Sequence, residues 1–126
     1  GQRITSIAGS SDYFAGGFLT YTNELKTKLL GVPADMIAQH TAVSEPVALA
    51  MAEGARKNAG ADYGLSVTGY AGPAGDQVGL VFIGVADQNG SEGFRYQFAA
   101  DRDRIRTLAT NTALDRLRRR LLAVSQ

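Results

Sequence analysis

The sequence predicts an α/β protein, a three-layer α/β/α sandwich built around a mixed sheet. Two observations carry this prediction. Apolar residues recur at helical spacing at residues 44–59 and 101–122, and runs of small, β-branched or aromatic residues lie between these segments. Strand and helix patterns that alternate along one short chain favour helices packed on both faces of a sheet.

The first part of the chain is predicted to be one strand followed by two short helical segments. Residues 12–22 combine aromatic and small residues with two glycines, which is typical of a buried strand with close backbone neighbours. Thr22 or Asn23 can cap a short helix at residues 24–30. A further helical turn is expected at residues 34–39.

The longest early helix is predicted to begin at Ser44. Ser44 is a favourable capping residue, Pro46 suits a first helical turn, and Gly60 ends the pattern. We expect the Ser44 hydroxyl to serve the helix cap. A strand of small and β-branched residues follows at 63–68, and then a glycine-rich loop at 69–76.

The remaining elements are a hairpin and a last helix. Residues 78–86 are apolar nearly throughout and read as a central strand, and residues 87–90 form a hairpin turn signal. Residues 93–98 alternate aromatic and polar side chains, as an antiparallel partner strand does. Asp101 is expected to cap the last helix.

Composition restricts the class of protein. The 126 residues suffice for one compact domain, expected to span residues 1–126. The net charge of +1 gives no strong field for nucleic acid or for a membrane surface. The absence of cysteine excludes disulfides, and His40, the only histidine, excludes a multi-histidine metal site. We therefore expect a cytoplasmic protein that binds neither nucleic acid nor membranes.

Tyr21 and Lys26 lie five residues apart where the predicted strand passes into a helix. A partly desolvated lysine has a lowered pKa and can take a proton from a nucleophile, while the phenol can orient a polar substrate. On spacing alone the structural explanation is favoured, namely an exposed lysine on a short helix and a tyrosine at a strand end.

Two further segments are candidates for binding an anion. The stretch that begins with Thr68 and Gly69 combines a strand end, a hydroxyl and a glycine-rich turn, which suits phosphate or oxyanion binding. A wide turn between strands explains it equally well. Arg102 could donate to a phosphate from the start of the last helix, although a solvated helix face is the favoured explanation.

Five segments in order carry a resemblance to one known family. Its members contain Tyr-Ser/Thr-Asn-Glu-x-Lys with a following Leu-Gly-Val, then Ala-Val-Ser-Glu, Met-Ala-Glu-Gly, Val-Thr-Gly-x-Ala-Gly-Pro and Asp-Arg-x-x-Ile-Arg. The corresponding segments here are 21–26 with 30–32, 42–45, 51–54, 67–73 and 101–106. Over essentially the whole chain, the sequence resembles the CinA carboxy-terminal domain family, the bacterial nicotinamide-nucleotide amidases.

The resemblance implies hydrolysis of the carboxamide of nicotinamide mononucleotide to nicotinate mononucleotide and ammonia, with no cofactor and no metal. It implies a serine nucleophile, Lys26 as base and Tyr21 as its assistant. Thr68 would lie near the reacting amide, and Arg102 is the candidate for the nucleotide phosphate. Asn23 and Gly69 are weaker candidates for substrate binding. The family also implies a homo-oligomer.

Two departures from the family pattern bear on the mechanism. Members carry the serine in a Glu-Ser-Cys/Ala-Thr-Gly-Gly segment, which this sequence does not contain, and residues 1–5 resemble the stretch just after that segment in other members. The stretch at 74–77 is also shorter than in other members. We expect the nucleophile to belong to a segment outside these 126 residues. The alternative is a non-catalytic nucleotide-binding or assembly module derived from the same family.

Overall fold

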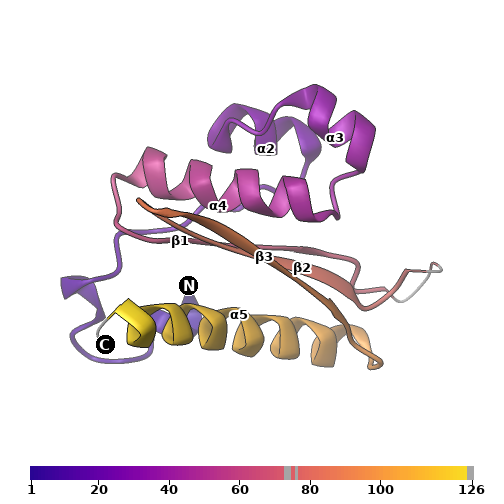
Figure 1. Ribbon diagram of the computed structural model, residues 1–126. Coiled ribbons are helices and arrows are strands. Elements are labelled where there is room, and N and C mark those ends of the chain that lie inside the picture. Colours follow the sequence, from indigo (N-terminus) through magenta and orange to yellow (C-terminus); the bar gives the residue numbers. More distant parts are fainter. Residues whose placement is uncertain (73–74, 76, 125–126) are drawn as a thin grey trace.

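The structure, a computed structural model, describes residues 1–72, 75 and 77–124. Figure 1 shows helices on both faces of a sheet: α4 covers one face and carries α2 and α3 above it, and α5 covers the other. The predicted α/β class and the flanking helices are therefore confirmed. The elements in chain order are α1 (Gln2–Thr5), a 3₁₀ turn (Ser10–Asp12), α2 (Asn23–Leu30), α3 (Ala34–His40), α4 (Glu45–Ala59), β1 (Gly64–Gly69), β2 (Leu80–Asp87), β3 (Gly90–Gln97) and α5 (Arg102–Val124).

The sheet within the described residues has the strand order β1-β2-β3, and both neighbouring pairs are antiparallel. The sequence had predicted a mixed sheet, and this part of the prediction is wrong. The connections explain the difference. Residues 70–79 join β1 to β2 and residues 88–89 join β2 to β3, whereas parallel neighbours need a crossover of a dozen or more residues.

The strand predicted at residues 12–22 is not formed. The 3₁₀ turn ends at Asp12, and residues 14–21 have no regular secondary structure. Leu19 is 95% exposed and Phe18 is 37% exposed, so the apolar side chains that suggested a buried strand face solvent. A strand needs a neighbour for its backbone hydrogen bonds, and in the part of the chain described here β1 pairs with β2 alone.

The helix ends, by contrast, follow local signals. Thr22 is the N-cap of α2 and its hydroxyl accepts a backbone hydrogen bond at 3.2 Å. Asp101 accepts one at 2.8 Å at the start of α5. Gly31 and Gly60 end α2 and α4 in the left-handed conformation, with φ of 70° and 63°. These boundaries confirm the predictions that were made from capping residues and glycines.

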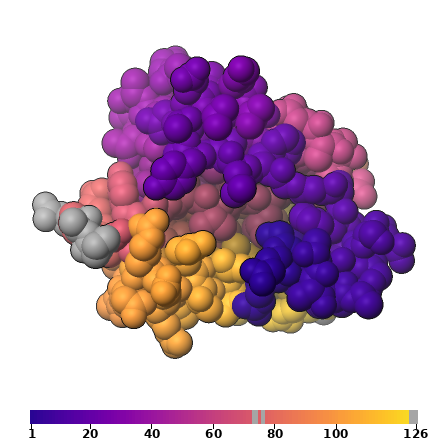
Figure 2. Space-filling view, turned by 180° about the vertical axis from the view of Figure 1, so that it is seen from behind, coloured from indigo at the N-terminus to yellow at the C-terminus, as the bar shows by residue number. Residues whose placement is uncertain are grey.

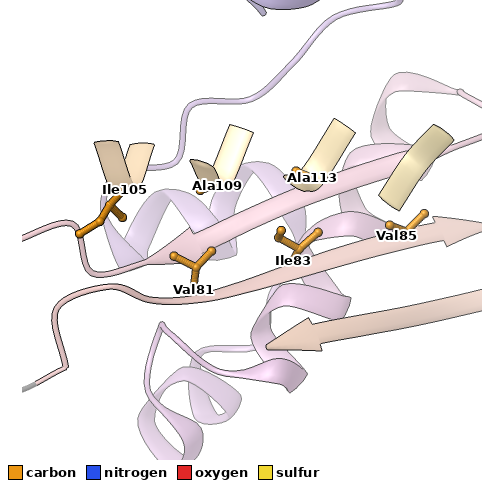
Figure 3. Close-up of a cluster of buried hydrophobic side chains, with 6 residues drawn as sticks. All are labelled: Val81, Ile83, Val85, Ile105, Ala109 and Ala113. Carbon is orange, nitrogen blue, oxygen red and sulfur yellow. The ribbon is translucent and has the colours of Figure 1, made fainter. Parts of the chain in front are cut away.

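One hydrophobic core lies between β2 and α5 (Figure 3). The β2 residues that contribute to it alternate along the strand, and the α5 residues recur every four positions, so each set forms one stripe. Ile83 has no exposed surface and Ile105 is 2% exposed. The six residues of this core are Val81, Ile83, Val85, Ile105, Ala109 and Ala113.

The opposite face of the sheet packs closely against α4 through small residues. A Cβ atom added to Gly84 of β2 would overlap the carbonyl oxygen of Ala48, and one added to Gly64 of β1 would overlap that of Ala52. Ala48 and Ala52 lie one helical turn apart on α4, and neither has any exposed surface. The backbones of α4 and the sheet are therefore in direct contact, and α4 is held at a fixed distance from β1.

A second hydrophobic cluster joins α4 to the two short helices above it. Its residues come from α2, the connection after α2, α3 and α4, so these three helices form one packed unit. This packing fixes α2, which carries the candidate base, relative to α4. The buried members of the cluster are Leu30, Val32, Ile37, Val47 and Met51.

Ion pairs from the partly buried Arg120 fasten the β2–β3 hairpin to α5. Arg120 donates through Nε to Asp87 at 2.9 Å and through Nη1 to Glu92 at 2.8 Å. Asp87 also accepts the backbone N–H of Asn89 at 2.7 Å, within the hairpin turn. The hydrogen bond from Arg120, followed by the one from Asn89, holds the pKa of the Asp87 carboxyl below its usual range.

Asp87→Asn is expected to lower stability at neutral pH and to remove part of the acid sensitivity of the fold. Because the folded pKa of Asp87 is lowered, its contribution is complete above the unfolded value of about 3.9 and is lost as pH falls through the folded pKa. The difference between the urea midpoints of the two proteins should be constant near neutral pH and should shrink as the pH is lowered from about 4 towards 3. Asp62→Asn, at an exposed site without a described ion pair, is the control. A difference that is equal at every pH would contradict this role of Asp87.

Candidate active site

Lys26 lies in α2 with only 7% of its surface exposed. Its Nζ donates a hydrogen bond to the carbonyl oxygen of Thr20 at 2.9 Å. Burial disfavours the charged form of an amine, and desolvation lowers the pKa of the Lys26 ammonium below its ordinary value. The interpretation that spacing alone had favoured, an exposed lysine, is therefore wrong.

Within the described residues, the Thr20 carbonyl is the one hydrogen-bond partner of the Lys26 side-chain amine, and no carboxylate pairs with that amine. A buried lysine in a structural ion pair keeps its proton because the partner charge stabilises it. Lys26 lacks that compensation. An amine whose pKa is lowered and that is held in one orientation by a single acceptor has properties that suit a general base.

Tyr21 and Asn23 flank Lys26 in sequence but lie at the surface. Tyr21 is 90% exposed, and Asn23 is the exposed first residue of α2. The described residues contain no hydrogen bond to the Tyr21 hydroxyl. Tyr21 follows directly after Thr20, whose carbonyl holds Lys26, so the phenol and the amine belong to one short segment. The role of Tyr21 as assistant to the base and the contact of Asn23 with the substrate stay predictions.

Thr68 lies near the end of β1 on the side that faces α4, and it is 7% exposed. Its hydroxyl donates to the carbonyl oxygen of Ala42 at 2.9 Å, across 26 residues of sequence. Ser66, two residues earlier on the same side, donates to the carbonyl oxygen of Ala48 at 2.6 Å. Both hydroxyls thus bind β1 to α4 and to the turn before it.

The turn that Thr68 contacts is strained. Thr41 has φ of 68° and ψ of 161°, a conformation that is essentially restricted to glycine and costs about 1–3 kcal/mol. The buried Ser44 hydroxyl holds it by donating to the Thr41 carbonyl at 2.9 Å. Ser44 is the N-cap residue of α4 as predicted, but its hydroxyl bonds this turn and not the helix. No sequence signal indicated the strain, since a β-branched residue argues against positive φ.

Arg102 is the exposed first residue of α5. Its Nη1 donates to the carbonyl oxygen of Gly72 at 2.6 Å, which ties the start of α5 to the glycine-rich turn after β1. A guanidinium has five N–H donors, so this bond leaves others available for a bidentate contact with a phosphate. The geometry is compatible with both the phosphate role and the solvated helix face.

Gly69 ends β1, where it pairs with Val81 of β2. A Cβ atom at this position would lie 2.8 Å from a methyl carbon of Val81. The absence of a side chain therefore keeps the end of β1 close to β2. The rest of the predicted glycine-rich loop is only partly described, because Pro73, Ala74 and Asp76 lie outside the described residues.

The candidate residues fall into two groups that share α4. Lys26, Tyr21 and Asn23 lie in or beside α2, which packs on α4. Thr68 and its neighbours lie at the end of β1. Seen from behind, the violet lobe of α2 and α3 lies above the orange start of α5 (Figure 2). We take the region between the two groups of residues as the candidate binding site.

Other kinds of site find no basis in the described part of the chain. No group of three histidine, aspartate or glutamate side chains there is arranged to hold a metal ion. None of the described helices combines the length and the apolar character that crossing a membrane requires.

The amino-acid sequence matches the family model of the CinA C-terminal domain over residues 1–121. The chain belongs to the CinA C-terminal domain family. The resemblance inferred from the five motifs is therefore confirmed. This CinA-family chain is 54% identical over 124 residues to a CinA-like protein of Citrifermentans bemidjiense and 54% identical over 125 residues to one of Geobacter metallireducens. It spans 30% of the length of each of these relatives.

Solved structures agree with the family assignment. The CinA-family chain is similar to the competence/damage inducible protein CihA from Agrobacterium tumefaciens, with a TM-score of 0.87 and 38% identity, over 97% of this chain and 75% of that one. It is also similar to a competence-damaged protein (CinA) superfamily protein from Klebsiella pneumoniae 700603. There the TM-score is 0.91 at 29% identity, covering 95% and 78% of the two chains.

Proposed function

We propose that this CinA-family domain hydrolyses the carboxamide of nicotinamide mononucleotide, with water as the second substrate and nicotinate mononucleotide and ammonia as the products. Lys26 acts as the general base, assisted by Tyr21. The observation that carries this proposal is the buried Lys26 amine, which has a lowered pKa and no described carboxylate partner. Perturbed lysines of this kind occur at catalytic sites more readily than in purely structural positions.

The second group of residues would bind the nucleotide. Arg102, which uses one N–H on the Gly72 carbonyl, would offer its remaining guanidinium N–H groups to the phosphate, and Thr68 at the end of β1 would lie near the carboxamide. Gly69 and Asn23 complete the contacts. The charge of the site suits this division, because an anionic phosphate requires a cation, while a neutral carboxamide requires only hydrogen-bonding groups.

The attacking hydroxyl is not assigned to any of these residues. No serine hydroxyl lies within hydrogen-bond distance of Lys26 Nζ among the described residues. Ser66 and Ser44 donate to backbone carbonyls instead. The Glu-Ser-Cys/Ala-Thr-Gly-Gly motif that supplies the serine in the family is absent from the sequence. Our proposal assigns the attack to the serine of that family motif and not to any serine of these 126 residues.

Ammonia release from nicotinamide mononucleotide tests the proposal directly. If Lys26 is the base, the neutral amine is the active form, so the rate should rise with pH through its folded pKa, which lies below the ordinary lysine value of about 10.4. The purified protein should also be weighed by mass spectrometry, because 13.3 kDa is the mass of these 126 residues alone.

The alternative is a non-catalytic nucleotide-binding or assembly module. The observation that favours it is the lack of a described nucleophile beside Lys26. Calorimetric titration with nicotinamide mononucleotide separates the two, since such a module binds the nucleotide and releases no ammonia. If the protein neither binds nicotinamide mononucleotide nor releases ammonia from it, both functions are contradicted.

A further inference from the structure

We propose that the C-terminal half of α5 and the β2–β3 hairpin form a second ligand site, which binds a small monocarboxylate with one aromatic ring. The site is a half-open cavity of about 170 Å³ on the face of the sheet that α5 covers. Three apolar residues, Val85, Phe94 and Ala123, form part of its lining, and Glu92 and three arginines of α5 form the rest. The lining thus combines an apolar surface with cationic groups.

The cavity exists because the apolar stripe of α5 does not continue to the end of the helix. The α5 residues of the core recur every four positions and end at Ala113, and Figure 3 shows Val85 beyond Ala113 at the end of the β2 row. Further along the helix, Arg116 and Arg120 face the sheet, and their guanidinium groups contact β3 and the hairpin. The space beside Val85 therefore remains open.

Arg116 is the cation of this lining that lacks an anionic partner within the described residues. Its guanidinium carbon lies 4.0 Å from the centre of the Phe94 ring, and its Nε donates to the Tyr96 hydroxyl at 2.5 Å. No carboxylate pairs with this half-buried side chain in the described part of the chain, and its two Nη groups have no hydrogen-bond partner there. A guanidinium binds a carboxylate through two parallel hydrogen bonds, so these Nη groups suit such a ligand.

The other charged groups of the lining are already paired. Arg120 binds Glu92 at 2.8 Å, and Arg119 binds Asp115 at 2.8 Å. A ligand would have to displace a carboxylate of the protein to use either of these arginines. Glu92 also disfavours a ligand with two negative charges. The charge left for a ligand is therefore that of Arg116, which favours a monoanion over a dianion.

The size and the apolar part of the lining determine the rest of the ligand. An apolar cavity of about 150 Å³ accommodates one benzene ring. A ring beside Val85 and Ala123 would bury apolar surface while its carboxylate binds Arg116. An acid as short as acetate would leave most of this volume unfilled. The combination of volume, apolar surface and one cation therefore matches an aromatic monocarboxylate.

The second site is separate from the candidate active site. Arg102 and Arg116 lie about 20 Å apart along the axis of α5, at a rise of about 1.5 Å per residue. Lys26 belongs to α2, which packs on α4 at the opposite face of the sheet (Figure 1). The inference therefore does not rest on the proposed amidase function.

An NMR titration of the full chain with benzoate tests the inference. Benzoate should bind with a Kd on the order of 1 mM, because a one-ring ligand in a half-open cavity makes few contacts. The amide signals that shift should be those of the second half of α5 and of the hairpin. Benzyl alcohol, which lacks the charge, acetate, which lacks the ring, and inorganic phosphate should each bind at least about tenfold more weakly.

Three variants locate the binding. Arg116→Gln should weaken benzoate binding at least about tenfold, because it removes the charged hydrogen bonds. Ala123→Leu keeps Arg116 and fills the cavity from an exposed helix position that leucine tolerates, so it should cause a similar loss without unfolding the chain. Arg104→Gln is the matched control, exposed on the same helix and away from the cavity, and should bind within about twofold of the wild-type chain.

Four results would overturn the inference. They are no binding of benzoate by the wild-type chain, equal binding of benzoate and benzyl alcohol, and unchanged binding in Arg116→Gln or in Ala123→Leu. Loss of binding in Lys26→Met together with full binding in Arg116→Gln would assign benzoate to the candidate active site instead. If the wild-type chain binds no benzoate and light scattering shows a dimer that Ala123→Leu dissociates, a second copy of the chain occupies the cavity. Ammonia release tests the amidase function separately, whatever the titration shows.

Discussion

Replacing Lys26 by methionine is expected to abolish ammonia release and to leave the fold as stable as before or more stable. General-base catalysis contributes roughly 10²–10⁴-fold to a rate, so the loss in kcat should be at least about a hundredfold. Stability should not fall, because methionine fills a similar volume and the variant no longer places an amine in a site that is 7% exposed. Turnover and urea denaturation of the same preparations check both parts.

The pH dependence of stability tests independently whether the pKa of Lys26 is lowered in the folded protein. The folded pKa of Lys26 is lowered, so the unfolded chain binds more protons in the range between the folded value and about 10.4. The wild-type protein should therefore gain stability relative to Lys26→Met as pH rises through that range. The opposite sign would mean that Lys26 is stabilised as a cation.

Lys28→Met is the matched control, since Lys28 lies on the exposed side of the same helix. Its turnover should equal that of the wild-type protein. Equal turnover in Lys26→Met would remove Lys26 from the mechanism, whatever the stability data show.

The helix boundaries that the sequence predicted correctly have local causes. A capping hydroxyl at Thr22, a carboxylate at Asp101 and left-handed glycines at Gly31 and Gly60 act within a few residues of the boundary that they set. The failed strand at residues 12–22 had the right composition, but a strand exists only if another lies beside it. Composition carries no information about that partner.

In the candidate site too, the sequence located residues but did not show their contacts. The motifs located Lys26 and Thr68, but lysine is seldom buried, so spacing could not indicate the burial that makes Lys26 a candidate base. The partner of Thr68 is 26 residues distant, and the strained turn that contains it is centred on a residue that disfavours its own conformation. Contacts across the fold, which only the structure provides, decide how both side chains can act.

Gly84→Ala is expected to destabilise the protein by about 3 kcal/mol or more, at the upper end of the range for overpacked cores. The new methyl group would overlap the Ala48 carbonyl oxygen and lie 2.6 Å from the Ser66 hydroxyl. Backbone atoms of a central strand and a long helix cannot yield as a side chain can, so α4 would have to move off the sheet. Urea denaturation at neutral pH measures the loss.

Gly17→Ala is the control, because a methyl group there meets nothing within 4 Å and the residue has no positive φ. That variant should be unchanged or more stable by about 0.4–1 kcal/mol, through the lower entropy of its unfolded chain. If both variants were equally stable, α4 would not rest directly on the sheet. The hydrogen bonds that Ser66 and Thr68 make to the carbonyls of Ala48 and Ala42 would then not be fixed in length.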